Sequence, residues 1–349
     1  MIETNYKDIF DIEKKVLDDI DPDLYPFLEF WRSEKSEIIV HTSGSTGKPK
    51  KISISKKQMT NSADATINHF KLKNQSTILC CLPLKYIGGK MMIVRGLKLK
   101  AKIILVKPKV NPFRNIKKKI DLLALTPLQL NNLSKESKNF KNIKLTLIGG
   151  GSLSEEIISK IKKLPNEFYQ TYGMTETVSH IAVRNLKKLS DNPNYKCLKG
   201  NSIRTNLRNQ LIINSENLNI QSLTTNDLSK VSGNKEFTIT GRLDTIINSG
   251  GLKIQSLDIE NQIKETLKND LFFIDKINCN KLGEKMILIA LEVVDLDRLK
   301  LSIKKIKDKK YRPKEIYLCS DFIYNQNQKI DKNKTKYSSI KKNNVHNIN

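Results

Sequence analysis

The stretch from His41 to Lys50, His-Thr-Ser-Gly-Ser-Thr-Gly-Lys-Pro-Lys, concentrates groups that bind anions. Glycine lets backbone N–H groups approach a ligand closely, hydroxyls add donors, and lysine adds the positive charge that phosphate prefers. The stretch is not a Walker loop, whose glycines are further apart and whose lysine is followed directly by a hydroxyl. A phosphate-binding loop is predicted, with a flexible polar turn as the alternative. The residues predicted to bind the phosphate are Thr42, Ser43, Gly44, Ser45, Thr46, Gly47 and Lys50.

A second group of residues places a hydroxyl beside a carboxylate directly after a predicted strand. The strand covers 167–172 and ends in Tyr172, and Gly173, Met174, Thr175 and Glu176 follow it. Mg²⁺ takes one or two carboxylates together with phosphate oxygens, so Glu176 is a candidate metal ligand and Thr175 a candidate phosphate donor. The alternative is a helix N-cap, in which threonine and glutamate satisfy backbone groups.

Three consecutive glycines, Gly149, Gly150 and Gly151, follow another predicted strand at 145–148. Ligands of open α/β sheets bind beyond the carboxyl ends of the strands. We therefore expect these glycines and the segment after Tyr172 to line one nucleotide site.

Asp227 and the sequence Gly-Arg242-Leu-Asp244 supply carboxylates and a guanidinium near a change in composition. A carboxylate can accept both hydroxyls of a ribose, as it does in dinucleotide sites. The alternatives are a surface turn for Asp227 and a salt bridge for Arg242. A plain surface turn is likewise the alternative for Gly250 and Gly251.

Alternating strands and helices before residue 184 predict an α/β fold with a layered, mostly parallel sheet. Predicted helices include 56–70, capped by Ser55, 91–99 behind a glycine pair, and one that starts in 115–120. Short β segments from 184 to 240 predict a small β subdomain. Residues 1–243 are assigned to a large N-terminal domain and 244–349 to a small α+β C-terminal domain, with a frayed end after residue 343.

The formal net charge is +26 over 349 residues. Clustered Lys and Arg neutralise nucleic-acid phosphates, so a basic nucleic-acid-binding protein is one alternative. The lysines are spread along the whole chain, however, which is more typical of solvated faces. Only 117–119 and 304–314 are dense, and both are expected in helical contexts.

The five cysteines lack a Cys-x-x-Cys pair, which argues against a zinc site and a disulfide framework and favours reduced thiols. The N-terminus carries no signal-like apolar segment, and no apolar run approaches the ~20 residues of a membrane span. These features predict a soluble cytoplasmic protein. The oligomeric state is left open.

Four signatures occur in order between residues 41 and 332: the loop 42–50, Tyr172 to Thr177, Gly241 to Asp244, and Asn325 to Lys332. This series resembles the acyl-adenylate-forming superfamily, which includes acyl-CoA synthetases, peptide-synthetase adenylation domains and luciferases. Asn226 departs from the Thr-Gly-Asp of that family. Gln328 and Lys332 replace a glycine and an arginine of the last signature, which weakens the match at Lys329.

The resemblance implies ATP and Mg²⁺ as cofactors and CoA as cosubstrate. It assigns the phosphates of ATP to the loop 42–50 and to Thr175, Mg²⁺ to Glu176, and the adenine to backbone around Gly149–Gly151. It assigns the ribose to Asp227 and Arg242. Lys329 would be the adenylation catalyst, in a mobile lid domain that pivots at Asp244 and carries Gly250 and Gly251 to a pantetheine tunnel.

Within the superfamily, Thr177-Val-Ser-His180-Ile-Ala and Pro83-Leu-Lys-Tyr86-Ile-Gly88-Gly are most similar to short o-succinylbenzoate–CoA ligases of menaquinone synthesis. Tyr86 and Gly88 would lie at the acyl pocket, with Tyr86 as its aromatic gate, and His180 is a candidate substrate contact. The implied reaction joins an aromatic carboxylate to CoA with conversion of ATP to AMP and pyrophosphate. Another aryl or acyl acid is the alternative substrate. Only 40 residues precede the loop, which departs from the long N-terminal subdomain of most relatives.

Overall fold

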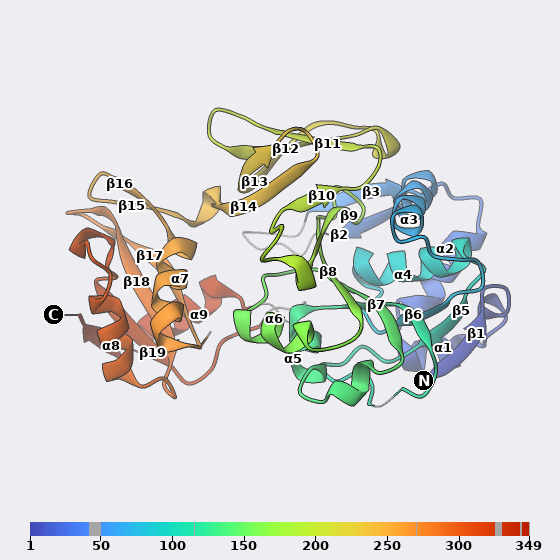
Figure 1. The fold of residues 1–349 in the computed structure, drawn as a ribbon, viewed down its shortest axis with the longest axis horizontal. Helices are drawn as coiled ribbons and strands as arrows, with labels where there is room; N and C mark the ends of the chain where they lie inside the picture. The colour runs from blue at the N-terminus through green and yellow to red at the C-terminus, as the bar shows by residue number, and fades with distance from the viewer. Residues whose placement is uncertain (42–49, 115, 270, 325–329, 343, 349) are drawn as a thin grey trace. The chain divides into compact units, whose positions relative to one another are not determined.

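A computed structural model describes residues 1–41, 50–114, 116–269, 271–324, 330–342 and 344–348 (Figure 1). Residues 42–49 of the predicted phosphate loop and Lys329 therefore lie outside the described residues. The chain forms two compact units. The first comprises Met1–Asn206, Ile212–Thr224 and Lys230–Thr238, and the second Leu207–Leu211, Thr225–Ser229 and Ile239–Asn349. The boundary at residue 243 remains a prediction.

Parallel strands form the middle of the sheet in the first unit. Among the described residues their order is β5 (Lys102–Leu105), β4 (Thr77–Cys80), β6 (Ile120–Leu125), β7 (Ile143–Ile148) and β8 (Glu167–Gly173). The antiparallel strands β1 (Ile2–Asn5) and β9 (His180–Asn185) flank them. The α/β class with a largely parallel core sheet is confirmed.

Helices cover both faces of this parallel core because its strands are apolar on both sides. Helices α5 (Pro127–Leu133) and α6 (Glu155–Lys162) pack on the face that carries Ile104 and Leu123. Helix α4 (Ile87–Lys98) lies on the other face, where a Cβ on Gly96 would come within 2.7 Å of Ile103. Helix α3 (Lys56–Phe70) packs beside α4, and α1 (Lys14–Ile20) and α2 (Leu24–Arg32) lie between β1 and α3 in the sequence.

The predicted strands on either side of the phosphate loop pair as an antiparallel hairpin, β2 (Glu37–His41) with β3 (Lys51–Ser55). Ser55 then caps α3 with a reciprocal capping box, in which Gln58 bonds back to the backbone of Ser55. Further strands continue the main sheet: β10 (Tyr195–Cys197), β14 (Glu236–Arg242), β13 (Ile220–Ser232), β12 (Gln210–Ser215) and β11 (Asn201–Thr205).

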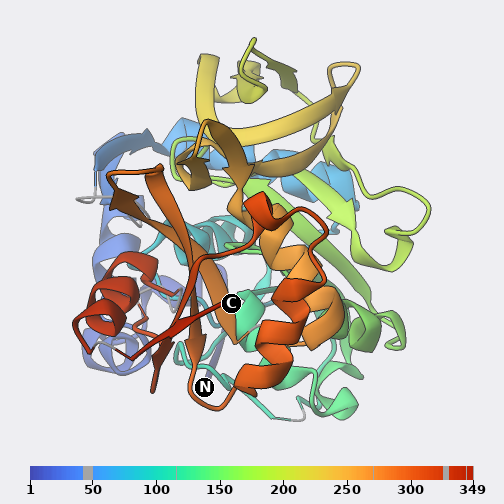
Figure 2. The same ribbon diagram turned by 90° about the vertical axis from the view of Figure 1, so that its left-hand side faces the viewer.

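The second unit is an α+β module. Its sheet runs β16 (Leu252–Gln255), β15 (Ile246–Ser249), β18 (Gly283–Leu291), β19 (Glu315–Cys319) and β20 (Val345–Asn347), with β17 (Phe272–Cys279) also on β18. Helices α7 (Ser256–Leu267) and α8 (Leu296–Lys304) pack on one face, and α9 (Lys332–Lys341) contributes Ile340 to the other. Figure 2 shows the red helix α9 and the orange helices α7 and α8 on opposite sides of the strands.

Three local predictions are wrong. Residues 116–119 form no helix, and Ile120 begins strand β6 because its pairing with Ile143 outweighs the local pattern. Residues 345–347 are not frayed but add strand β20 to the edge of β19, which satisfies backbone groups there. Helix α4 begins at Ile87 and includes the glycine pair.

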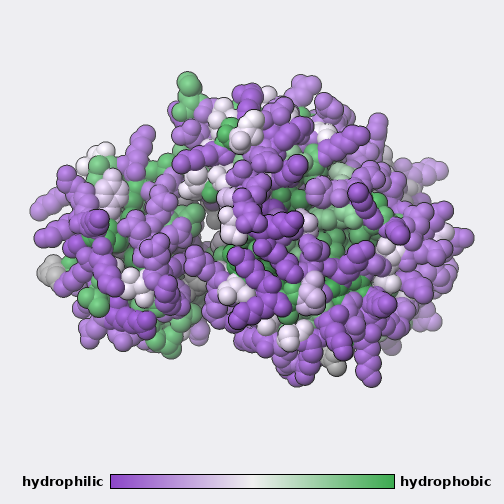
Figure 3. All heavy atoms as spheres, in the orientation of Figure 1, coloured by the Kyte–Doolittle hydropathy of each residue, from purple (hydrophilic) through white to green (hydrophobic). Residues whose placement is uncertain are grey.

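The lysine-rich segments lie on the surface. Lys117, Lys118 and Lys119 are exposed, as are Lys304, Lys305, Lys307, Lys309 and Lys310 after and at the end of α8. Hydrophilic side chains predominate over the face drawn in Figure 3. Among the described residues, no helix is both long and apolar enough to cross a membrane.

Candidate active site

The carboxyl ends of the parallel strands bring several predicted segments to one edge of the sheet in the first unit. The segment from Cys81 to Tyr86 follows β4, Gly149–Gly151 follow β7, and Met174–Ser179 follow β8. Since β4, β6, β7 and β8 are neighbours and parallel, these segments leave the sheet on the same side. The parallel pairing of the strands thus brings these three segments together.

Thr177, which is fully buried, ties the segment after β8 together. Its Oγ1 accepts from the Met174 N–H at 2.9 Å and lies 2.8 Å from the Ser179 carbonyl oxygen. Val178 then takes a left-handed conformation, with φ of 62°, which is rare for a β-branched residue. Such strain costs roughly 1–3 kcal/mol and persists only where the surroundings enforce it, often at functional sites. Thr175 and Glu176, the predicted phosphate donor and metal ligand, lie within this constrained turn.

Gly173 is required by the same turn. A Cβ at this position would come within 2.2 Å of the Ser179 carbonyl oxygen, a backbone atom that cannot rotate away. We expect Gly173→Ala to displace the turn and to lower the free energy of unfolding by about 1–3 kcal/mol, measured by chemical denaturation. Gly88→Ala is the control, because an added Cβ at Gly88 would meet Leu82 at an ordinary contact distance of 3.6 Å. Equal losses in both variants would contradict the steric explanation.

The glycines after β7 are similarly confined. A Cβ on Gly149 would lie 3.0 Å from the Thr171 hydroxyl oxygen, and Gly150 has a φ of 89°. The Gly151 carbonyl oxygen accepts from the Gln170 side chain at 2.8 Å. The segment is therefore held against the end of β8, with its backbone available at the edge of the sheet.

Tyr172 belongs to an aromatic cluster within the first unit. Its ring lies 5.1 Å from that of Phe237, edge to face, and 5.8 Å from that of Tyr195. Both separations fall in the range preferred by aromatic pairs. This packing fixes the end of β8 from which the Gly173–Glu176 segment departs.

Glu176 fits the chemistry expected of a Mg²⁺ ligand. Its side chain is exposed and forms no ion pair with a described cation. No group of three or more His, Cys, Asp or Glu among the described residues could hold a metal alone. A single carboxylate suits Mg²⁺, which keeps several waters and takes its other ligands from phosphates.

Arg95, near the end of α4, is a residue that the sequence reasoning missed. Its side chain is 2% exposed, yet no carboxylate among the described residues pairs with it. One nitrogen, Nη2, donates to the Ser179 hydroxyl at 3.0 Å, and Nε has no hydrogen-bond partner in the described structure. Burial lowers the pKa of Arg95 to about 10. A buried guanidinium is costly unless it is paired, so this one is suited to an anionic ligand.

His180 connects Arg95 to helix α3 through a chain of hydrogen bonds. Its Nε2 lies 3.1 Å from the Thr66 hydroxyl, which itself donates to the Ser62 carbonyl, so the network places the proton on Nε2. Nδ1 lies 3.4 Å from the Ser179 hydroxyl oxygen. Burial, then the charges of Arg95 and His69, lower the pKa of His180, and the ring is neutral. His180 is thus a buried neighbour of the Arg95–Ser179 pair.

Tyr86 and Gly88 lie at the start of α4. Tyr86 is its N-cap residue and is partly exposed, and Gly88 is within van der Waals distance of Leu82. Burial, then the nearby charge of Asp23, raise the pKa of Tyr86. The same helix therefore carries the predicted gate at one end and Arg95 near the other.

In the second unit, Arg242 bonds to both of the predicted acidic residues. Its Nη1 lies 2.7 Å from Asp227 Oδ1, while Nε and Nη2 contact the two oxygens of Asp244 at 3.0 and 2.9 Å. The hydrogen bond to Asp244 is the main cause of the raised pKa of Arg242. Asp227, the predicted ribose ligand, and Asp244, the predicted pivot, thus share one guanidinium.

Gly250 and Gly251 form the two-residue loop between β15 and β16. Their φ values are 57° and 81°, and Ser249 pairs with Leu252 across the loop. Positive φ at both central positions is the signature of a type I′ hairpin. The paired glycines between alternating segments could have predicted this hairpin.

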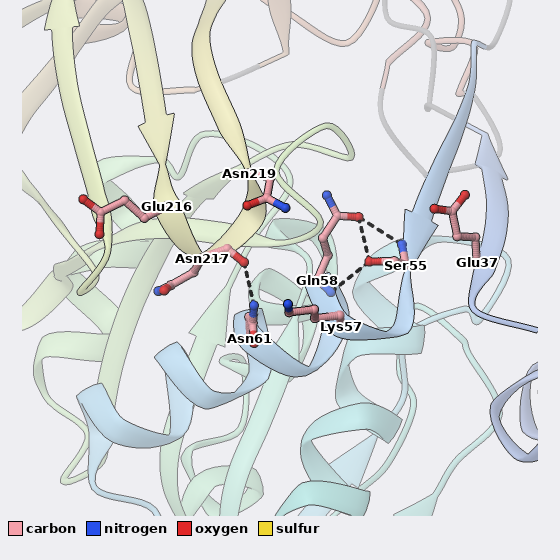
Figure 4. A pocket seen from close by; sticks show the side chains of 8 residues that line it. All are labelled: Glu37, Ser55, Lys57, Gln58, Asn61, Glu216, Asn217 and Asn219. Atoms are coloured by element: carbon pink, nitrogen blue, oxygen red, sulfur yellow. Dashed lines mark hydrogen bonds between the residues drawn. The ribbon is translucent and has the colours of Figure 1, made fainter.

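A polar pocket of about 350 Å³ lies in the first unit, beside the start of α3 (Figure 4). Gln58 Nε2 donates to the Leu218 carbonyl at 2.9 Å and Asn61 Nδ2 to the Asn217 carbonyl at 2.7 Å. These bonds hold α3, which follows the β2–β3 hairpin. None of the predicted site residues lines the pocket, whose walls are Glu37, Ser55, Lys57, Gln58, Asn61, Glu216, Asn217 and Asn219.

Comparison with known proteins identifies a family for this chain. The AMP-binding enzyme family matches residues 21–207, more than half of the chain. The chain is 28% identical over 150 residues to 2-succinylbenzoate–CoA ligase of Bacillus cytotoxicus, covering 41% of this chain and 31% of that protein. The alignments to the first curated relatives span about a third of their length.

Two solved structures are similar over most of the chain. An AMP-forming acyl-CoA synthetase/AMP-acid ligase II-like protein of Dyadobacter fermentans is 31% identical, covering 97% of this chain and 99% of its own, with a TM-score of 0.64. The o-succinylbenzoate CoA synthetase of Bacillus subtilis, in complex with its acyl-adenylate intermediate, is 19% identical, covering 93% of this chain and 76% of its own. Its TM-score of 0.74 shows a shared fold.

Proposed function

This chain belongs to the AMP-binding enzyme family, and we propose that it is an ATP-dependent acid–CoA ligase whose substrate is 2-succinylbenzoate. The relative in Bacillus cytotoxicus carries the name of that activity. Such a ligase would serve menaquinone synthesis in the cytoplasm.

The observation that carries the choice of substrate is Arg95. A dicarboxylic acid such as 2-succinylbenzoate presents one carboxylate for reaction and keeps another. The buried guanidinium, with Ser179 as its one good acceptor among the described residues, can bind the carboxylate that does not react. Arg–carboxylate pairs are bidentate and strong when water is excluded.

The proposed reaction has two steps. In the first, a carboxylate oxygen of the acid attacks the α-phosphorus of ATP, and pyrophosphate leaves. This chemistry is mostly positioning and charge stabilisation. Residues 42–50 would bind the β- and γ-phosphates, Thr175 the α-phosphate, backbone near Gly149–Gly151 the adenine, and Asp227 with Arg242 the ribose. Glu176 would hold Mg²⁺, which neutralises phosphate charge when bound.

In the second step, the thiolate of CoA attacks the acyl carbon, and AMP leaves with the electron pair of the broken bond. Lys329 would act in the first step, by neutralising the attacking carboxylate and the α-phosphate. The second unit would then reorient at Asp244 and present the Gly250–Gly251 hairpin to the pantetheine arm. Such closures complete a different site for each half-reaction.

Pyrophosphate release tests this proposal directly. The purified protein would be given ATP, Mg²⁺ and one acid at a time, with and without CoA. We expect strong turnover that needs CoA and is confined to 2-succinylbenzoate. Turnover with another aryl acid would retain the mechanism and reject the substrate. No pyrophosphate release with any acid, together with nucleic-acid binding that weakens steeply with salt, would favour the alternative of a basic nucleic-acid-binding protein.

Asp227 provides a test of the ribose assignment. Asp227→Asn removes the charge that two ribose hydroxyls would share, and charged hydrogen bonds contribute about 1.5–3 kcal/mol. We expect the KM for ATP to rise about ten- to a hundredfold, while the KM for the acid changes little. Asp258→Asn is the control, because Asp258 is exposed on α7 of the same unit. An unchanged KM for ATP would reject the assignment.

A further inference from the structure

Two buried charged side chains hold the backbone of one residue, Leu84, between β4 and α4. The Asp21 carboxylate accepts from the Leu84 N–H at 2.9 Å, and the Lys90 ammonium donates to the Leu84 carbonyl oxygen. Asp21 is 4% exposed and Lys90 6% exposed. Both backbone polar groups of Leu84 are therefore satisfied by ionised side chains from outside its own segment.

Each of the two charges is itself held in place. The other oxygen of Asp21 accepts from the Asp23 N–H at 2.9 Å, at the turn between α1 and α2. The Lys90 ammonium lies 5.5 Å from the centre of the Phe27 ring, which α2 buries. Burial lowers the pKa of Lys90, and the negative charges of Asp23 and Asp21 partly oppose that change.

Burial of two charges would be energetically unfavourable if they served only the stability of this turn. Taking ionised groups out of water costs several kcal/mol each, and apolar residues of similar volume are often as good or better for stability. Asp21 and Lys90 are not within ion-pair distance of one another in the described structure, since each is directed at Leu84 instead. What the two charges supply is a fixed position for that residue.

The position of Leu84 matters because the candidate acyl site begins there. Tyr86, the predicted gate, is two residues further on and donates its backbone N–H to the Pro83 carbonyl. A Cβ on Gly89 would lie 2.4 Å from the same carbonyl oxygen, so the helix start and the Pro83–Tyr86 segment are in close contact. Displacing Leu84 would therefore move Tyr86 and the first turn of α4, the helix that carries Arg95.

We propose that Asp21 and Lys90 are positioning residues that set the selectivity of the acyl pocket by holding Leu84, without touching the substrate. This inference rests on the proposed ligase function. Asp21 lies in the turn between α1 and α2, so the segment before the phosphate loop would contribute to the acyl site from a distance.

The test compares selectivity, which does not depend on the fraction of protein that is folded. For each variant, kcat/KM would be measured by pyrophosphate release for the best acid and for a smaller aryl acid. We expect Lys90→Met and Asp21→Asn to reduce the ratio of the two values by about tenfold, through the KM for the acid, because a shifted pocket wall loses discrimination of this order. The KM for ATP should stay unchanged.

Three further variants complete the design. Lys90→Arg keeps a buried cationic donor and should retain most of the selectivity, and Asp21→Asn decides the test if Lys90→Met fails to fold. Lys98→Met, in the last turn of α4, and Asp19→Asn, exposed on α1, are matched controls expected to keep the ratio. An active wild type with an unchanged ratio in Asp21→Asn, and in Lys90→Met where that variant folds, would overturn the inference. A wild-type protein that releases no pyrophosphate with any acid would instead overturn the proposed function, and this inference with it.

Discussion

Arg95→Met is expected to make the protein more stable and less active at the same time. The substitution removes a buried guanidinium that has no described carboxylate partner. Because burial lowers the pKa of Arg95 to about 10 in the folded protein, well below its ordinary value, folding is penalised wherever the group is protonated. The penalty is complete below about pH 10 and fades only as the pH rises from there towards the ordinary pKa of arginine. At neutral pH we expect the free energy of unfolding to increase by about 1–4 kcal/mol.

The activity should change in the opposite direction. Loss of a buried Arg–carboxylate contact costs about 2–4 kcal/mol, which would lower kcat/KM for 2-succinylbenzoate roughly thirty- to a thousandfold. An aryl acid with a single carboxylate should lose far less. The two measurements are denaturant unfolding at pH 7 and pyrophosphate release with both acids. Equal losses for the two acids, or a destabilised protein, would show that Arg95 serves the fold rather than the substrate.

Lys329→Ala is expected to separate the two half-reactions. The lysine lies outside the described residues, so this prediction stands on the sequence signature around Ile330 and Asp331. Removing one preorganised charge from a developing transition state typically costs about 10²–10³ in rate. We expect pyrophosphate release to fall by at least that factor.

The second half-reaction gives the control for the same variant. Supplied with a synthetic acyl-adenylate and CoA, Lys329→Ala should form thioester at close to the wild-type rate, because the lysine acts only in adenylation. Lys332→Ala is the matched comparison for the loss of a neighbouring lysine, since Lys332 pairs with Glu260 at 3.0 Å. Equal loss of both half-reactions in Lys329→Ala would reject the assignment of the lysine to one step.

The local signals in the sequence were strongest where one short segment determines the structure. Ser55 and Gln58 are adjacent to an apolar pattern that fixes the start of α3, and the predicted helix 56–70 is confirmed. Strand β19 (Glu315–Cys319) is likewise predicted by its own apolar run. The segments after β7 and β8 could be outlined in the same way, because each is a continuous stretch at the end of a strand.

The errors and omissions have a common physical origin, which is contact between distant segments. Gly88 and Gly89 suggested a break before a helix, but the lack of a Cβ on Gly89 lets α4 start close to Pro83. In the sequence, Arg95 resembles any other polar residue of a helix. Only its burial against Ser179 indicates that it could bind a substrate anion. The bond of Asp21 to Leu84, 63 positions later, could not be inferred from the neighbours of Asp21 in the sequence.

The interleaving of the two units limits how this protein can be divided. The chain changes unit after residues 206, 211, 224, 229 and 238, so the second unit includes two short inserts that are distant from its main body in sequence. A truncation near residue 243 would separate Asp227 from Asp244 and leave Thr225–Ser229 attached to the wrong fragment. Exchange of the second unit for that of a relative would accordingly require the replacement of three pieces of chain, because no single crossover point exists.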